Sequence, residues 1–379
     1  MRYCVKCLFP DTKPNLGFDE NGVCDACSHS EEKQKIDWKA KKEDLRKVIE
    51  KYRSKSNSNY DCVIPVSGGK DSHFQSYFLK TEFDLNPLLV SFRPRDWTEL
   101  GRKNLENLKS LGFDCIEFCA NPIVYKKLAK FGLEELGDVA WPEHMGIFPC
   151  AFRVAIEQHI SLIVWGENPA LEYGGPKKLA EKSTFDKEYD DKHGSYFQDK
   201  IKAEDMIKYG FKPSELKFYM YPPDDEIKKL GIVKIFLGSY VNWNARKQLE
   251  GVKKIGLTVL DEPNEGTFTN YENLDTKYVG LHDYFKWLKY GYGRATDHAS
   301  IDIRNGLITR DEGLKLVKQY EGKIPTKYLD EFLEEFDFTD ESFLKICEKF
   351  TNKNLFKTDE NGNLLRDDAG NLEKLKYDN

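Results

Sequence analysis

The sequence predicts an α/β protein built on a doubly wound parallel sheet, and two patterns support this fold class. Five short apolar runs follow one another from residue 60 onward, over 62–66, 88–92, 115–118, 162–165 and 233–237. Segments of helical character lie between them, over 72–81, 98–111 and 151–159. Parallel strands buried on both faces read as continuous apolar runs, and crossover helices join them. We therefore expect five strands in a sheet of the kind that binds nucleotides.

The remaining segments are expected to surround this sheet as separate parts. A cysteine-bearing module occupies 1–30, and an amphipathic helix over 38–52 with a Ser/Asn/Lys linker fills 31–59. The α/β domain covers 60–250, and its polar stretch near 170–230 is too long for an ordinary connection, so we expect substrate loops there. From 251 to 379 the chain reads as a helical, acidic C-terminal region that ends in a polar tail.

Composition restricts the class of protein. The 379 residues carry 32% charged and 40% hydrophobic residues with a formal net charge of −6, which disfavours nucleic acid as the main partner. No window approaches the roughly 20 apolar residues that span a bilayer, and no apolar signal peptide follows Met1. We therefore expect a cytoplasmic protein, in which the nine cysteines are reduced rather than paired in disulfides.

One loop carries the strongest signal for chemistry. It directly follows the first apolar run, precedes a helix, and consists of Ser67, Gly68, Gly69, Lys70, Asp71 and Ser72. The two glycines let the backbone approach an anion, and the helix start offers free N–H groups to it. Lys70 adds a positive charge, while Asp71 can orient Mg²⁺. The loop is therefore predicted to hold a pyrophosphate; an ordinary Ser/Gly turn is the alternative.

The N-terminal cysteines have the spacing of a four-thiolate metal site. Two CxxC pairs, Cys4 with Cys7 and Cys24 with Cys27, are separated by 16 residues. This spacing is typical of a zinc ribbon with structural Zn²⁺, because four protein ligands leave no open coordination position. An iron–sulfur centre is the rival interpretation, since the same ligands can hold one. Free thiols are the third possibility.

The loop resembles the SGGxDS loop of the PP-loop ATP pyrophosphatases, the adenine nucleotide alpha hydrolase-like fold. It is not a Walker A loop, because Asp71 follows Gly69-Lys70 and no glycine stands at the required earlier position. The resemblance implies binding of ATP with Mg²⁺, cleavage between the α and β phosphates, and adenylation of a substrate carbonyl oxygen. Lys70 and Asp71 are the implied catalytic residues.

A wider set of segments resembles the N-acetyl sugar amidotransferases, which include the pseudaminic acid amidotransferases of lipopolysaccharide or flagellin glycan synthesis. The set joins the cysteine module and the Ser67–Ser72 loop with Trp97–Leu105, Trp165–Pro169 and Gly291–Ser300. The resemblance implies an ATP-dependent, AMP-forming reaction that converts an acetamido group into an acetamidino group. Ammonia-derived nitrogen would replace the carbonyl oxygen.

The same resemblance suggests which further residues form the site. The nucleotide is expected to lie near residues at the ends of two strands: Ser91, Phe92, Arg93, Gly166, Glu167 and Asn168. Arg294, Asp297 and His298 are expected to contact the substrate, an N-acetylated sugar, although a surface ion pair is an alternative for Arg294 and a packed histidine for His298.

Partners and rival functions follow from what the chain lacks. No segment resembles a glutaminase, so the resemblance implies a separate glutaminase subunit that supplies ammonia. A PP-loop tRNA-modifying enzyme that replaces oxygen with sulfur is the first alternative. A zinc-ribbon scaffold that only binds nucleotide is the second.

Overall fold

The computed structural model describes residues 1–54, 59–185 and 201–375. The linker expected up to residue 59 and the insertion expected near 170–230 therefore lie partly outside the described residues. Among the described helices, none is both long enough and apolar enough to cross a membrane.

The sheet confirms the predicted fold class. Its strands are β1 Cys62–Pro65, β2 Pro87–Arg93, β3 Asp114–Cys119, β4 Leu162–Trp165, β5 Thr184–Phe185 and β6 Val233–Phe236. Their order is β3-β2-β1-β4-β6-β5, and every neighbouring pair is parallel except β5 with β6. The sequence did not predict β5, because two residues are too few to form a readable pattern. The strand order reverses between β1 and β4, because β1 to β3 build one half of the sheet and β4 to β6 build the other.

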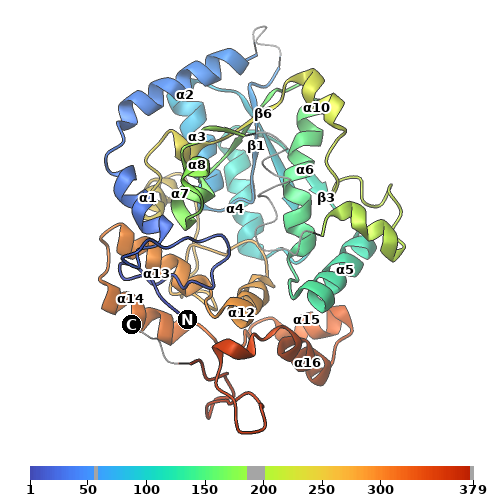
Figure 1. The fold of residues 1–379 in the computed structure, drawn as a ribbon. Helices are drawn as coiled ribbons and strands as arrows, with labels where there is room; N and C mark the ends of the chain where they lie inside the picture. The colour runs from blue at the N-terminus through green and yellow to red at the C-terminus, as the bar shows by residue number, and fades with distance from the viewer. Residues whose placement is uncertain (55–58, 186–200, 376–379) are drawn as a thin grey trace.

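Alternation along the strands produces an apolar core on each face of the sheet. Val63 points to one face, where it packs with residues of α5, α6 and α10. Cys62 and Ile64 point to the other face, where they pack with residues of α2, α3 and α4. Figure 1 shows α2 and α3 on one side of the strands and α6 and α10 on the other. Successive side chains of a strand point to opposite faces of the sheet. Because both faces carry an apolar core, the strands are apolar at successive positions.

Three of the four helices predicted in the first two thirds of the chain, 38–52, 72–81 and 98–111, coincide in place with α2, α3 and α4, whereas α6 is longer than its predicted segment. Helix α6 begins ten residues before the predicted segment. Pro142 and Pro149 suggest a break in the sequence, but the helix accommodates Pro142 in its first turn and Pro149 in its interior. The helices are α1 Asp25–Lys33, α2 Trp38–Tyr52, α3 Lys70–Phe83, α4 Glu99–Ser110, α5 Pro122–Phe131, α6 Trp141–Glu157, α7 Pro169–Tyr173, α8 Lys177–Ala180, α10 Asp224–Leu230 and α11 Ala245–Lys253. Short 3-10 or π segments cover Gly132–Leu136, Ala203–Tyr209 and Leu237–Ser239.

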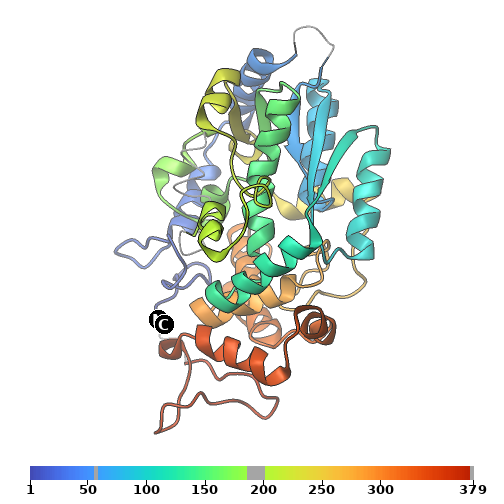
Figure 2. The ribbon, with the colours of Figure 1, turned by 90° about the vertical axis from the view of Figure 1, so that its right-hand side faces the viewer.

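The C-terminal region is helical, as expected, but a long irregular segment precedes its helices. Residues 254–278 cross from α11 to α12 and hydrogen-bond to α4 and its N-terminal flank: Thr98 N donates to Asp275 O at 3.0 Å, and Asn104 Nδ2 to Thr258 O at 2.8 Å. The helices that follow lie beneath the sheet in Figures 1 and 2. They are α12 Val279–Tyr290, α13 Arg294–Arg304, α14 Arg310–Tyr320, α15 Leu329–Phe336 and α16 Asp340–Phe350, followed by the 3-10 turn Lys353–Leu355.

Candidate active site

The candidate site lies where the turns after β1 and β4 meet. These neighbouring strands are parallel, and the loop Ser67–Ser72 follows one while Gly166 and Glu167 follow the other. In open α/β sheets, ligands bind outside the carboxyl ends of the strands at the point where the strand order reverses. The fold thus brings together two segments that lie about a hundred residues apart in the chain.

The loop requires glycine at position 68. Gly68 has φ +92°, and a Cβ atom there would stand 2.8 Å from the backbone nitrogen of Leu105. Gly69 is the N-cap of α3, and in the described structure no side chain caps that helix start. Ser72 Oγ accepts from Ser67 N at 3.0 Å, so this hydroxyl closes the loop on itself. The start of α3 therefore has the arrangement that binds anions in other proteins, with its first N–H groups left without a capping side chain among the described residues.

Lys70 is buried and surrounded by carboxylates. Its side chain is only 2% exposed, and its Nζ lies 2.5 Å from Asp71 Oδ1 and 3.6 Å from Glu272 Oε1. Burial alone would lower the pKa of Lys70, but the Asp71 and Glu272 carboxylates outweigh burial and raise it. Lys70 is therefore charged at neutral pH.

A cavity with about 130 Å³ of space for water opens beside Lys70. Residues from both halves of the chain line it. The α/β part contributes Lys70, Asp71, Glu167, Glu172, Tyr173, Trp243, Asn244 and Ala245; the C-terminal region contributes Tyr271, Glu272, Arg294, His298, Ile301, Asp302 and Asn305. Carboxylates outnumber the basic groups in this lining, so the cavity suits a cation or a neutral molecule beside the anion that Lys70 would hold.

Glu167 is the carboxyl group in this cavity whose protonation is most perturbed. Burial and the nearby Asp71 carboxylate raise the pKa of Glu167 to about 8, against the opposing effect of Lys70. Tyr173, on α7, donates its hydroxyl to Glu167 Oε2 at 3.5 Å. A carboxyl group with a pKa close to neutral can both accept and return a proton.

The C-terminal wall holds its charges in fixed pairs. Arg294 Nε lies 3.1 Å from both carboxylate oxygens of Asp283, and its Nη2 lies 2.9 Å from Asp283 Oδ1. Asp302 of this wall is paired with Arg246 of α11, whose Nη2 contacts Asp302 Oδ2 at 2.6 Å. His298 Nδ1 lies 2.6 Å from Thr267 Oγ1, and burial together with Arg294 lowers the pKa of His298 to about 3. That imidazole is therefore neutral at physiological pH.

Several residues that the sequence suggested do not line the cavity. Ser91 and Phe92 are buried, because β2 continues to Arg93 and directs Phe92 against Phe118 and Tyr219. The Arg93 guanidinium lies over the Trp97 ring, 4.8 Å from its centroid.

Asn168 and Asp297 are occupied in the same way by structural contacts. Asn168 accepts from Ala170 N at 3.0 Å to cap α7 and donates to Ser239 Oγ at 2.9 Å. Asp297 pairs with Lys286 beneath the wall. Both residues therefore lie behind the cavity lining rather than in it.

The sequence did not single out Glu272, Tyr173 or Asp302. Tyr173 stands six residues after Glu167, so its closeness to the Trp165–Pro169 segment is the one sequence feature that could have pointed to it. Glu272 lies in the irregular segment 254–278, where no periodicity marks a position as inward-facing. Only the folded chain reveals its contact with Lys70.

The four N-terminal cysteines gather into one metal-binding cluster. All four are buried, and their sulfur atoms lie within 4.8 Å of one another. Cys4 Sγ is 3.7 Å from Cys27 Sγ, and Cys7 Sγ is 3.6 Å from Cys24 Sγ. The module is anchored to cavity-lining helices: Leu8 N donates to Ser300 Oγ on α13 at 3.3 Å, and His29 Nδ1 is 3.0 Å from Ala170 O on α7. A bound metal would thus support the cavity walls from outside.

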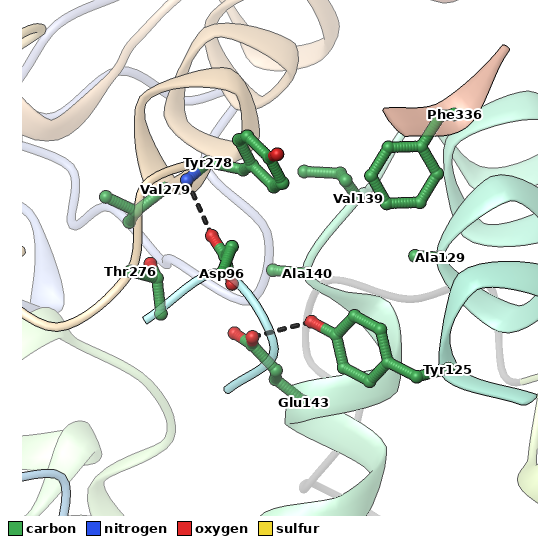
Figure 3. A pocket seen from close by; sticks show the side chains of 10 residues that line it. All are labelled: Asp96, Tyr125, Ala129, Val139, Ala140, Glu143, Thr276, Tyr278, Val279 and Phe336. Atoms are coloured by element: carbon green, nitrogen blue, oxygen red, sulfur yellow. Dashed lines mark hydrogen bonds between the residues drawn. The ribbon is translucent and has the colours of Figure 1, made fainter. Parts of the chain in front are cut away.

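A second pocket, with only about 10 Å³ of space for water, lies between α5, α6 and the start of α12 (Figure 3). Tyr125 donates its hydroxyl to Glu143 Oε1 at 2.6 Å, and Tyr278 N donates to Asp96 Oδ2 at 2.7 Å. Burial raises the pKa of Asp96 to about 6 and that of Glu143 well above its usual value, and the Asp96 charge adds to the latter shift. The pocket is too small for a substrate, and it lies where α5 and α6 meet the C-terminal region.

Comparison with known protein families finds a match in the C-terminal region of the chain. Residues 265–369 match the family described as "LPS biosynthesis protein WbpG-like, C-terminal domain". The matched segment includes Glu272, Arg294 and Asp302, which form the C-terminal wall of the cavity. Among curated proteins, none matches the chain significantly.

One similar solved structure is the U34-tRNA thiolase NcsA from Methanococcus maripaludis with its 4Fe-4S cluster. It is 14% identical, with 86% of this chain and 93% of that chain covered and a TM-score of 0.28. At this score the likeness adds nothing to what the sheet and the loop establish by themselves.

Proposed function

We propose that the protein is an ATP-dependent, AMP-forming amidotransferase that converts an acetamido group of an N-acetyl sugar into an acetamidino group. One observation carries this proposal: Lys70 of the Ser67–Ser72 loop and Arg294 of the segment similar to the WbpG-like domain line the same cavity. A nucleotide-activating loop and a wall similar to that of a lipopolysaccharide biosynthesis protein would thus act on one substrate.

In this proposal the nucleotide phosphates lie against the start of α3. The backbone N–H groups after Gly69 and the Lys70 ammonium would hold the pyrophosphate portion. Asp71 and Glu272 present carboxylate oxygens, the ligand type that Mg²⁺ prefers, on either side of that ammonium. Bound Mg²⁺ would neutralise phosphate charge. Lys70 would then exchange its contact with Glu272 for one with a phosphate oxygen.

The reaction needs the amide oxygen to become a leaving group, because the amide nitrogen makes its carbon a poor electrophile. The oxygen attacks the α-phosphorus, its bond to that phosphorus forms, and pyrophosphate leaves. Ammonia then attacks the carbon, the carbon–oxygen bond breaks, and AMP leaves with the original oxygen. The attacking nitrogen must lose a proton, and Glu167, with its pKa raised to about 8, is placed in the cavity to accept it.

The C-terminal wall would recognise the sugar. Because Arg294 and Arg246 are already paired with Asp283 and Asp302, the wall offers polar groups of little net charge. Such a surface suits the hydroxyl groups of a neutral sugar. Arg294 keeps part of its side chain exposed and could also contact a carboxylate or phosphate of the substrate through its planar fork.

Ammonia would come from a separate glutaminase subunit. Because the reaction consumes ATP, it would take place in the cytoplasm. The cysteine cluster would hold Zn²⁺. Around one tetrahedral ion with Zn–S bonds of about 2.3 Å, sulfur atoms stand roughly 3.8 Å apart. The separations of 3.6 and 3.7 Å fit this arrangement, whereas cubane-cluster cysteines each bind a different iron and stand further apart.

The test is product analysis with the purified chain, ATP, Mg²⁺, ammonium and a panel of acetamido sugars. We expect AMP and pyrophosphate together with a sugar whose mass shows replacement of oxygen by NH. Oxygen-18 in the acetamido carbonyl should appear in AMP. Label that stays out of AMP would refute adenylation of the amide oxygen, and efficient use of glutamine by the chain alone would refute the separate glutaminase.

The tRNA-thiolating alternative draws on the cysteine cluster, whose ligands also suit iron and sulfur. It predicts iron in the purified protein, and AMP formation that depends on tRNA and a sulfur donor rather than on a sugar. The acid-rich cavity disfavours it, because a phosphate backbone would face carboxylates there.

A further inference from the structure

Three potential metal ligands meet at the junction between α6 and α12, outside the cavity. Asp138 lies just before α6, His144 lies in the first turns of α6, and His282 lies in the first turn of α12. One ligand atom from each lies within 4.8 Å of the other two. None of the three lines either cavity described above.

The local geometry directs both imidazoles at one buried carboxylate. His282 Nδ1 lies 2.7 Å from Asp138 Oδ1, and His144 Nδ1 lies 3.8 Å from Asp138 Oδ2. The two rings are 5.0 Å apart with planes at 71°, so neither stacks flat upon the other. The Asp138 side chain is 3% exposed and that of His282 14%, whereas that of His144 is 43% exposed.

We propose that Asp138, His144 and His282 bind a divalent first-row transition metal ion of the Zn²⁺ type. Ligand atoms bonded to one ion at about 2.0–2.2 Å stand roughly 3–3.5 Å from one another. The two separations of 2.7 and 3.8 Å bracket that spacing, so small side-chain shifts suffice. Two imidazoles and one carboxylate favour Zn²⁺, Fe²⁺ or Mn²⁺ over Mg²⁺ and Ca²⁺, which prefer oxygen ligands alone.

A hydrogen bond between His282 and Asp138 is the simpler account, but it leaves His144 unexplained. At 3.8 Å, His144 Nδ1 is beyond the normal length of a hydrogen bond to the carboxylate. An ion between the three groups would draw His144 inward, and its exposure leaves room for that movement. Three protein ligands also leave coordination positions open to water or to another oxygen or nitrogen donor.

A metal ion at this site would link the segment that packs on the sheet to the C-terminal region, next to the cavity wall. Asp138 and His144 belong to the segment that packs on the sheet, while His282 precedes Asp283, the partner of Arg294 in the cavity wall. A metal ion there would fix the start of α12 against α6. The proposal does not depend on the sugar reaction, because it concerns metal content and stability alone.

The experiment measures metal equivalents by mass spectrometry of the untagged full chain after equilibration with Zn²⁺ and gel filtration. We expect one equivalent beyond that of the cysteine cluster. His144→Gln and His282→Gln should each lose that equivalent and keep the other, while Cys4→Ser should show the opposite pattern. His159→Asn is the matched control, because His159 is an exposed histidine in a left-handed conformation that asparagine tolerates.

Two further measurements keep the outcome decisive. Far-UV circular dichroism establishes that each variant is folded, and Co²⁺ substitution distinguishes the sites, because only thiolate ligands give a sulfur-to-metal charge-transfer band. Zn²⁺ should raise the melting temperature of the Cys4→Ser chain but not that of a Cys4→Ser, His144→Gln chain. A wild-type chain without the extra equivalent, or a His144→Gln chain that retains it, would overturn the proposal.

Discussion

The two walls of the cavity carry charge in opposite ways. On the loop wall, Lys70 is held by Asp71 and by Glu272, a residue that belongs to the other wall. On the C-terminal wall, Arg294 is forked onto Asp283, and Asp302 is paired with Arg246 of α11. The loop wall therefore has a cation that can exchange partners, whereas the C-terminal wall is already neutralised.

This difference indicates a division of labour. A phosphate chain brings several negative charges and needs a cation that can leave a weaker partner, as Lys70 can leave Glu272. A sugar brings hydroxyl groups and needs dipoles that stay in place without reorganisation. The following predictions test whether the two walls differ in this way.

The largest effect is expected at Lys70. Lys70→Ala removes the cation that we propose to face the phosphates, so AMP formation should fall by about 10²–10³-fold, the cost of losing one preorganised electrostatic contact. The measurement is the rate of pyrophosphate release with saturating substrate. Lys103→Ala, at an exposed position of α4, is the control and should keep the wild-type rate. A normal rate in Lys70→Ala would remove the loop from the chemistry.

Arg294 should instead show its main effect in stability. Arg294→Ala leaves the Asp283 carboxylate, 3% exposed, without its partner. Because the Arg294 side chain is 24% exposed, we expect a loss somewhat below the roughly 3–5 kcal/mol of fully buried pairs, about 2–3 kcal/mol in the free energy of unfolding. Urea denaturation measures it. Asp283→Asn in the same chain should restore part of the loss; no restoration would mean that the pair is not the cause.

The contrast between the walls also explains what the sequence could predict. The loop wall is contiguous, since Ser67–Ser72 joins a strand to a helix, and its glycines, lysine and aspartate carry their chemistry in order. The apolar runs predicted five of the six strands for the same local reason. Glu272 and Asp302 lie in segments that only tertiary packing brings to Lys70, and no local pattern marks them. Phe92 was suggested as a binding residue, but strand alternation directs it into the core.

Glu272 sharpens the comparison, because it belongs to the C-terminal region and contacts the loop. Glu272→Gln keeps its size but weakens its hold on Lys70 and removes a carboxylate suited to Mg²⁺. We expect a higher Mg²⁺ requirement and a rate about tenfold lower at limiting Mg²⁺, equivalent to about 1.4 kcal/mol. Mg²⁺ titrations of AMP formation check this, with Glu262→Gln, an exposed residue, as control. An unchanged Mg²⁺ dependence would mean that Glu272 contacts Lys70 but does not help to bind Mg²⁺.

Glu167 should control part of the pH dependence of stability. Its pKa of about 8 in the folded protein is above the usual 4.5, so the folded chain binds this proton more tightly than the unfolded chain does. The stability that Glu167 contributes is therefore fully present below about pH 4.5 and declines as the pH rises toward 8.

Glu167→Gln removes the carboxyl group that binds this proton. The decline in the free energy of unfolding between pH 5 and 8 should therefore become shallower by at most about 1.4 kcal/mol per pH unit. Glu272, Asp96 and Glu143 also have raised pKa values, so part of the slope should remain in the variant. Urea denaturation at several pH values measures the slope, with Glu262→Gln as the exposed control. If Glu167→Gln and wild type lost stability in parallel, Glu167 would titrate as an ordinary carboxylate. Its carboxylate would then be a weaker base than proposed and would assist little in removing the proton from the attacking nitrogen near neutral pH.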